Sequence, residues 1–175
     1  MSEEREEVLK KAIDEERKKN IKIARHNRKY NLLLYGIKEK NDENIYVTIK
    51  EFFKKNLRLS SDAVDQMFFA NAHRLPSNGT GPKPIIVRFV RMFDRDLVLD
   101  QVYAGTLPKG YSILVDLPPV MKEQRYKLMQ VAYKLRNPAD GVNKLKTRIL
   151  ELNDKVILQV RKSRDEKWNT YDTSV

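Results

Sequence analysis

The residues of this sequence that could do chemistry are chiefly arginines and lysines, and Arg88 is the most informative of them. It interrupts the apolar stretch KPIIVRFV (83–90), which has the character of a buried strand. Because alternate residues of a strand point to opposite faces, Arg88 points away from the core if Val87 and Phe89 point into it. A guanidinium on an open sheet face can bind a phosphate or stack on a base. The alternative is an ion pair with an acidic residue of a neighbouring strand.

The charge of the whole chain favours a polyanionic partner. Lysine and arginine number 35 against 24 aspartates and glutamates, which gives a formal net charge of +11, and the isoelectric point is about 9.7. A field of this sign attracts nucleic acid most often and anionic lipid less often. The alternative is a lysine-rich surface whose charge only keeps the protein in solution.

Several classes of protein are disfavoured by what the sequence lacks. It has no cysteine, which excludes disulfides and thiolate zinc sites and favours a reducing compartment. No apolar run is long enough to span a bilayer, so we expect no membrane partner, and the charged residues from Glu3 onward leave no recognisable signal peptide. No paired carboxylates, phosphate-binding glycine motif or metal-ligand cluster is visible. We therefore predict no enzymatic activity, no cofactor and no metal site.

The N-terminal part, residues 1–28, is predicted to be a helix, either solvated or the end of a coiled coil. Residues 3–29 contain neither glycine nor proline, and their apolar residues form a weak, interrupted stripe. Acidic residues predominate in the first part, and the basic ones then follow with no acid among them: Arg17, Lys18, Lys19, Lys22, Arg25, Arg28 and Lys29. This pattern fits a basic arm leading into the next domain, and it fits a merely solubilising helix face equally well.

Residues 29–117 alternate between strand and helix patterns in the order β-α-β-β-α-β. The predicted strands are 31–37, 66–75, 84–90 and 111–117, and the predicted helices are 43–57, with Asn41 and Asp42 as its cap, and 94–103. Two βαβ halves of this kind build a ferredoxin-like sandwich, an α+β fold in which both helices cover one face of an antiparallel sheet. The other face of the sheet is then open, and a binding site can lie there.

Residues 118–160 are predicted to form a second, small α+β domain. Two prolines, Pro118 and Pro119, end the preceding unit, and a helix follows over 120–136. The stretches 147–152 and 155–160 then flank a two-residue turn and form a β-hairpin. The remaining residues, 161–175, form a polar tail that we expect to fray.

At this level of organisation the chain resembles a known family. The stretches YNLLLYGI, ENIYVTIKEFFKKNL, AHRL, KPIIVRF and VDLPP followed by KEQRYKL, from about residue 28 to about residue 158, resemble the first-open-reading-frame RNA-binding protein of LINE-type retrotransposons. The resemblance implies an N-terminal coiled coil that trimerises the protein, a central RNA recognition motif domain and a small C-terminal domain. It also implies sequence-tolerant binding of single-stranded RNA and DNA, packaging of the element's own transcript, and nucleic-acid chaperone activity.

Ten residues are predicted to contact the nucleic acid. The resemblance implies such contacts for Asn31 with the two basic residues before it, for the loop that Arg74 opens, and for Arg125. Basic residues of the C-terminal domain are expected beside Arg125 in one cleft. Tyr35 is a candidate for stacking on a base, or an ordinary half-buried tyrosine. The complete set is Arg28, Lys29, Asn31, Tyr35, Arg74, Arg88, Lys122, Arg125, Lys146 and Arg148.

Some positions depart from what such domains usually carry. Pro84 and Ile86 stand where an ordinary RNA recognition motif has stacking aromatics. Leu33 falls where the family often has a basic residue. On the helix over 120–136, Tyr126 is interpreted as a packing residue rather than a stacking one.

We therefore expect a single-stranded RNA- and DNA-binding protein that packages retrotransposon RNA and acts as a nucleic-acid chaperone. It is expected to form a homo-oligomer, a trimer, through its N-terminal helix, and to work in cytoplasmic ribonucleoprotein particles and in the nucleus. The alternative is an oligomerising scaffold whose charge serves only solubility. A scaffold needs no arginines on a common side, so the positions of Arg88 and Arg125 discriminate between the two.

Overall fold

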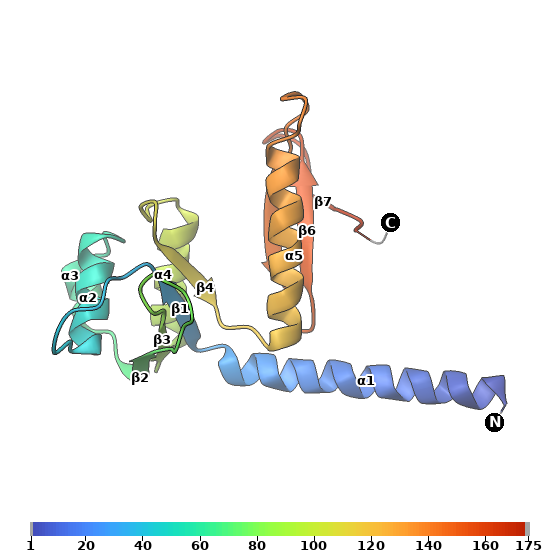
Figure 1. Cartoon of the computed structure of the whole chain (residues 1–175), viewed down its shortest axis with the longest axis horizontal. Coiled ribbons are helices and arrows are strands. Elements are labelled where there is room, and N and C mark those ends of the chain that lie inside the picture. Colours follow the sequence, from blue (N-terminus) through green and yellow to red (C-terminus); the bar gives the residue numbers. More distant parts are fainter. Residues whose placement is uncertain (1, 174–175) are drawn as a thin grey trace. The chain divides into compact units, whose positions relative to one another are not determined.

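The computed structural model describes residues 2–173 of the chain and has the α+β character that the sequence predicts. By its internal contacts the chain divides into two units, whose elements are labelled in Figure 1. We call Arg28–Asp116 the central unit, and Met1–Asn27 together with Leu117–Val175 the terminal unit. In the described residues each unit contains one antiparallel sheet.

The central unit has four strands and three helices. In chain order they are β1 (Asn31–Tyr35), α2 (Ile45–Lys55), α3 (Ser61–Asp65), β2 (Phe69–Arg74), β3 (Ile85–Phe89), α4 (Met92–Tyr103) and β4 (Ser112–Val115). The strands lie in the order β2-β3-β1-β4, and every neighbouring pair is antiparallel. The two middle strands are therefore β1 and β3, and the residues on them have sheet neighbours on both sides.

One face of this sheet forms the core of the central unit. Leu32 and Val87 pair across β1 and β3, and both side chains are fully buried. The helix α2 lies on this face, because its buried Phe53 stacks on Phe89 with the ring centroids 6.3 Å apart. The buried Val98 of α4 adds a further apolar side chain. Burial of apolar surface of this kind is the main term that stabilises such a unit.

The helices α2 and α3 begin at side-chain caps. The Asn44 carboxamide accepts hydrogen bonds from the backbone N–H groups two and three residues later, at 3.1 and 3.4 Å, and so caps α2. The prediction that Asn41 and Asp42 cap this helix is therefore wrong, and Asp42 instead adopts the left-handed conformation (φ 53°) in the preceding turn. The helix α3 was not predicted, and it begins in the same way at Ser60.

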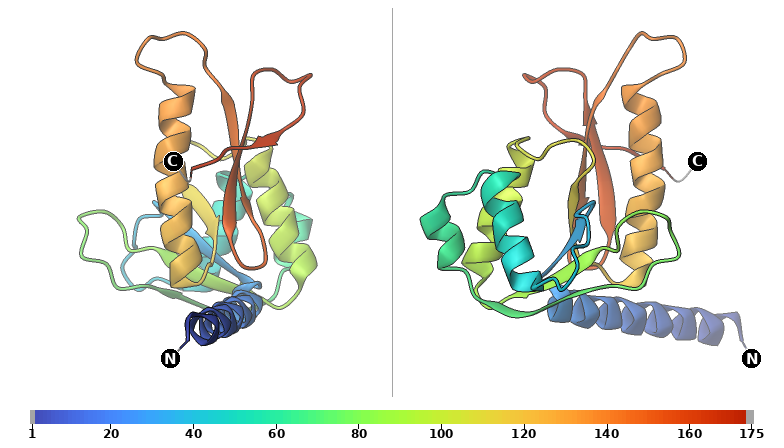
Figure 2. Two further views of the ribbon diagram at one scale, coloured as in Figure 1. Left: turned by 90° about the vertical axis from the view of Figure 1, so that its right-hand side faces the viewer. Right: turned by 60° about the vertical axis from the view of Figure 1, so that its left-hand side comes forward.

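In the terminal unit one helix packs on a three-stranded sheet. The elements are α5 (Pro119–Arg136), β5 (Lys146–Glu151), β6 (Val156–Arg161) and β7 (Asn169–Thr170), and the strand order is β5-β6-β7. The helix lies along the hairpin of β5 and β6, as Figures 1 and 2 show. Met121 and Ala132 of α5 and Leu158 of β6 are at most 1% exposed. The predicted helix and hairpin are thus confirmed.

The chain beyond the hairpin continues the sheet instead of fraying. Thr170 of β7 pairs with Gln159 of β6, and the Tyr171 N–H donates to the carbonyl oxygen of Leu158 (2.8 Å). Backbone pairing of this kind requires the segment between β6 and β7 to return along the sheet edge. The prediction of a frayed tail from residue 161 is therefore wrong for the segment that includes β7.

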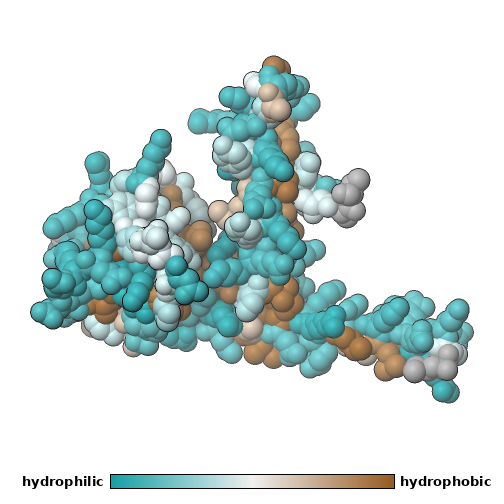
Figure 3. Space-filling model, viewed as in Figure 1, coloured by the Kyte–Doolittle hydropathy of each residue, from teal (hydrophilic) through white to brown (hydrophobic). Residues whose placement is uncertain are grey.

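The helix α1 (Glu3–Arg28) has no buried residue along its length. The side chains of Val8, Leu9 and Ile13 are between 50% and 66% exposed, and Figure 3 shows apolar patches among the hydrophilic surface of this helix. An exposed apolar stripe on a charged helix is typical of a helix that packs against another helix. None of the helices in residues 2–173 combines the length and the apolar character that a membrane crossing requires.

Candidate nucleic-acid interface

The second face of the central sheet carries polar and charged side chains. Asn71, Arg88 and Asn31 lie in one row, because these residues pair with one another across β2, β3 and β1 and paired residues share a face. The register confirms the predicted alternation in which Arg88 points away from the core. A shallow hollow of about 170 Å³ lies on this face, lined by Asn31, Asn71, His73, Ile86 and Arg88. We call this surface the open face.

Arg88 is the exposed cation in the middle of the open face. Its Nη1 donates a long hydrogen bond to the Asn31 Oδ1 (3.4 Å), and the Asn31 Nδ2 donates in turn to the Asp116 carboxylate (2.9 Å). Because the Asn31 amide is neutral, this contact orients the guanidinium without cancelling its charge. The order Arg88–Asn31–Asp116 thus offers a donor group on β3, an amide on β1 and an acceptor group directly after β4.

Tyr30 adds an aromatic ring beside Arg88, and it was not among the predicted residues. The Arg88 Cζ lies 5.7 Å and the Lys29 Nζ 5.3 Å from the centroid of this ring, within the range of cation–π contacts. The Phe89 N–H donates to the Tyr30 carbonyl (2.9 Å), and Arg95 of α4 donates to the carbonyl of Lys29. These bonds fix the backbone just ahead of β1. The available signal was the run RKY directly before a strand, because rings among basic residues are typical of single-strand binding.

Three further predicted residues lie in the central unit near either end of β1. Lys29 and Arg28 precede the strand and are half-buried, and Arg28 is also the last residue of α1. Tyr35 ends the strand, is half-buried and pairs with Ser112 of β4. Two-residue alternation places Tyr35 on the same face as Asn31. Their contact with nucleic acid stays a prediction.

Arg74, at the end of β2, holds several loops together and was wrongly assigned to phosphate binding. Its guanidinium donates two hydrogen bonds to Glu43 (2.7 and 3.2 Å) and three to the carbonyl oxygens of Ile37, Lys38 and Lys83 (2.6, 3.3 and 2.7 Å). An arginine has five N–H donors, so these bonds use all of them. The hydrogen bond from Arg74 also lowers the pKa of Glu43, against the opposing effect of partial burial.

Arg125 is a buried residue and not a surface contact. It is 4% exposed between α5 and the terminal sheet, and its Nη1 lies 3.9 Å from the Glu151 Oε1 of β5. Removal of one partner of a buried ion pair leaves a charge without compensation, so substitutions at Arg125 would disturb the fold of this unit. The predicted role of Arg125 in binding is therefore replaced by a role in packing α5 on the sheet.

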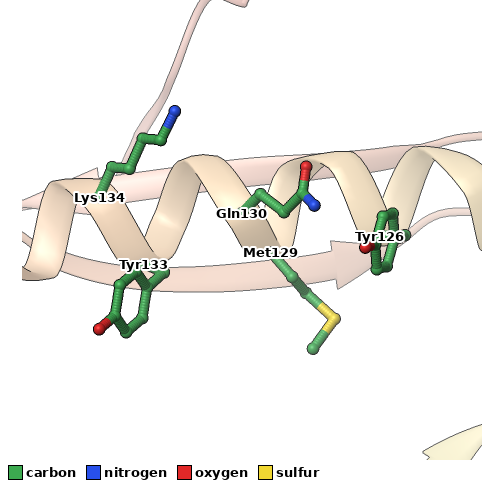
Figure 4. A pocket seen from close by; sticks show the side chains of 5 residues that line it. All are labelled: Tyr126, Met129, Gln130, Tyr133 and Lys134. Atoms are coloured by element: carbon green, nitrogen blue, oxygen red, sulfur yellow. The ribbon is translucent and has the colours of Figure 1, made fainter.

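A second group of exposed side chains runs along α5, where Lys122 is the predicted contact. Tyr126 and Tyr133 are 64% and 63% exposed, so the interpretation of Tyr126 as a packing residue is wrong. At 100° per residue, Lys122 and these two rings lie on one stripe of the helix. Figure 4 shows the hollow of about 490 Å³ beside this stripe, which is lined by Tyr126, Met129, Gln130, Tyr133 and Lys134. The stripe offers rings and a lysine for the same kinds of contact as the open face.

Lys146 and Arg148 lie on a different side of the terminal unit from Arg125. They alternate along β5 with Thr147 and Glu151, which face α5 through a hydrogen bond from Arg136 and the ion pair with Arg125. Lys146 and Arg148 therefore point to the face of the sheet that α5 does not cover. The expectation that they share one cleft with Arg125 is wrong.

Comparison with known proteins adds no family to this description. A scan against protein-family models finds no match, and a search of curated proteins finds none either. What the fold and the open face define is an α+β protein with antiparallel sheets and a polar sheet face that exposes Arg88. The resemblance to the LINE family thus rests on the residue pattern alone.

Proposed function

We propose that the protein binds single-stranded RNA and DNA with little sequence preference, and that the open face is its main contact. The observation that carries this proposal is the row of Asn71, Arg88 and Asn31 on an exposed sheet face, with the ring of Tyr30 beside Arg88. The guanidinium supplies a charge for a phosphate, the amides supply donors and acceptors for a base edge, and the ring supplies a stacking surface.

The shape of the open face favours an extended strand over an enclosed small molecule. Its hollow of about 170 Å³ is smaller than the roughly 300–1,000 Å³ of typical ligand cavities. Unpaired bases can lie flat on such a face, whereas an A-form duplex keeps its base edges inside its grooves. The net charge of +11 adds a general attraction for a polyanion.

The arrangement of the central unit supports its assignment to the ferredoxin-like class in the form of an RNA recognition motif. The helix α2 follows β1, α4 follows β3, and the strand order is β2-β3-β1-β4. Asn31 and Arg88 stand on the two middle strands, which carry the stacking residues in such motifs. Ile86 departs from the motif, and the ring of Tyr30 is our candidate for the missing aromatic contact.

Together with the resemblance to the LINE family, the proposed binding of single strands and the arrangement of the central unit support a more specific proposal. The protein packages retrotransposon RNA into a ribonucleoprotein particle and acts as a nucleic-acid chaperone, in the cytoplasm and the nucleus, without enzymatic turnover. Charge contacts and stacking on rings are sequence-tolerant, which is what the packaging of a long transcript requires.

Fluorescence anisotropy with a labelled single-stranded RNA of mixed sequence tests the binding function. Six cations of the predicted set remain after Arg74 and Arg125 are withdrawn: Arg28, Lys29, Arg88, Lys122, Lys146 and Arg148. If each neutralises one phosphate, log affinity falls against log salt with a slope of about −4, at about −0.7 per contact. A single-stranded DNA of the same sequence is expected to bind similarly, and a duplex of the same length more weakly.

Two outcomes of this titration would contradict the proposal. One is the absence of binding at low salt, which would leave the scaffold function as the better explanation of the charge. The other is a clear preference for the duplex, because the proposed contacts on the open face are with unpaired bases, which a duplex does not offer.

The exposed stripe of α1 favours a second property, self-association through this helix, which a scaffold and an RNA-packaging protein would share. The double variant Leu9→Glu and Ile13→Glu is expected to convert the homo-oligomer, a trimer by the resemblance, into a monomer, because it places charges in the apolar seam. Light scattering coupled to size exclusion measures the mass. The matched control is Lys11→Gln with Lys18→Gln, which makes the same change in net charge on the opposite side of the helix.

A wild-type protein that is already monomeric at high micromolar concentration would reject self-association through α1. Loss of the oligomer in both variants would assign the effect to net charge and not to the stripe. An oligomer that binds no RNA would favour the scaffold.

A further inference from the structure

The face of the terminal sheet that α5 does not cover is rich in cations. Lys146 pairs directly with Arg161 across β5 and β6, and Arg148 is the diagonal neighbour of Arg161 on the same face. The only acidic residue in these strands, Glu151, lies on the other face toward Arg125. The strand residues of the basic face are Lys146, Arg148, Leu150, Ile157, Gln159, Arg161 and Thr170.

Trp168, the single tryptophan of the chain, lies against both arginines of this face. The Cζ atoms of Arg161 and Arg148 are 4.2 and 4.6 Å from the centroid of one of its rings, well within the range of cation–π contacts. The Arg148 Nε also donates to the Gln159 Oε1 (2.8 Å). The ring and the amide hold the two guanidiniums in place and neutralise neither of them.

The arrangement carries an electrostatic cost within the folded protein. Like charges directly opposite across two strands are destabilising, and the Lys146–Arg161 pair is of this kind. In the described residues the Arg161 Nε is buried without a hydrogen-bond partner, although its Nη1 donates to the carbonyl of Arg164 (3.2 Å). A bound anion would offset the repulsion between these cations, whereas stability alone would favour an acid at one of the positions.

We propose that Lys146, Arg148 and Arg161, arranged around Trp168, form a second contact for the phosphate backbone of a single strand. The proposal rests on the proposed function, because that function supplies the strand, but it concerns a separate surface in the other unit. The two stacked guanidiniums present donors in fixed directions to phosphate oxygens, and Lys146 adds a flexible point charge. A strand that reaches both faces gains affinity because the second contact is intramolecular.

The emission of Trp168 tests this contact in the wild-type full chain. Unlabelled single-stranded RNA is expected to quench this emission and to shield the ring from acrylamide, over the same RNA concentrations that change the anisotropy of a labelled strand. Inorganic phosphate at equal ionic strength is expected to leave the emission unchanged, because a lone phosphate gains nothing from neighbouring contacts.

A pair of variants adds an independent measurement. Lys146→Gln with Arg148→Gln is expected to weaken RNA binding about tenfold at low salt and to make the salt slope shallower by about 1.4, at about 0.7 per contact. Lys10→Gln with Lys127→Gln, two exposed residues of the helices α1 and α5, is the matched control with the same change in net charge, and it is expected to bind like the wild type. Arg148→Lys keeps the charge and is expected to keep the salt slope, and far-UV circular dichroism checks that each variant is folded.

The outcomes separate this inference from the proposed function. An RNA that raises the anisotropy but leaves the emission and the acrylamide quenching of Trp168 unchanged would overturn the second contact and leave the open face intact as the binding site. No change in anisotropy at low salt would reject the proposed function and this inference together. Equal responses to RNA and to inorganic phosphate would make the face a site for free anions and overturn the backbone contact.

Discussion

Arg88→Glu is expected to weaken the binding of single-stranded RNA about a hundredfold at low salt, because it removes a phosphate contact and a stacking cation and adds repulsion. Arg88 is exposed, and the ladder of β3 with β1 and β2 is made by backbone groups that the substitution leaves in place. The variant is therefore expected to stay folded. Anisotropy titrations with the same RNA at several salt concentrations measure the loss.

Lys55→Glu provides a matched control for this variant. Lys55 is an exposed residue in the last turn of α2, the helix that lies on the core face of the same sheet, so the substitution makes the same change in net charge away from the open face. Equal losses in both variants would mean that the overall charge and not the open face governs binding. A folded Arg88→Glu variant with wild-type affinity would reject the open face as the site.

The open face could be predicted from the sequence because strand alternation is a local property. In KPIIVRF, residues that differ by two positions point to the same side, so the orientation of Arg88 follows once the apolar residues are assigned to the core. The pairing of Arg88 with Asn31 and Asn71 was not accessible in this way, because it depends on which strands are neighbours. The role of Tyr30 was missed for the same reason, since its ring meets Arg88 only across the sheet.

The roles predicted for Arg74 and Arg125 show that a local sequence pattern contains no information on tertiary contacts. Arg74 and Arg125 look like the other cations in the sequence, yet each has an acidic partner distant in the chain, Glu43 and Glu151. Whether a charge faces solvent or a partner is decided by tertiary packing. The sequence pattern and the resemblance therefore predicted nucleic-acid contacts for two arginines that stabilise the fold.

The prediction of a frayed tail from residue 161 was wrong for a different physical reason. A strand of two residues has no periodicity to detect, and most of the residues between β6 and β7 are polar or charged. What holds β7 in place is the pairing with β6 and the contact of Trp168 with two arginines. A lone tryptophan in a polar tail was the one available signal, because a large ring is seldom left without a packing partner.

Arg74→Met is expected to lower the free energy of unfolding of the central unit by about 2–4 kcal/mol, since it breaks a largely buried ion pair and leaves three backbone carbonyls without their donors. The side chains of Arg74 and Glu43 are only 13% and 12% exposed, so water replaces the lost bonds poorly. The loops that Arg74 joins contain residues 37–38, 43 and 83, and all of them are expected to loosen.

Urea denaturation followed by two signals assigns this loss to one unit. Far-UV circular dichroism reports on both units, whereas the emission of Trp168 reports on the terminal unit that contains it. The expected result is an earlier transition in circular dichroism with an unchanged transition in Trp168 emission. Lys40→Met is the matched control, because the Lys40–Glu51 ion pair is exposed and such pairs contribute little to stability.

The advantage of the wild type over Arg74→Met is expected to depend on pH. Arg74 holds the pKa of Glu43 below its ordinary value of 4.5, so the ionised carboxylate binds protons less readily in the folded state than in the unfolded chain. Its stabilising effect is therefore complete above about pH 4.5 and is lost as the pH falls through the lowered pKa of the folded state. The difference in unfolding free energy between wild type and variant should accordingly be constant near neutral pH and shrink in acid. A difference that stays the same down to the acid limit of folding would mean that the carbonyl contacts of Arg74, and not its pairing with Glu43, stabilise this corner of the central unit.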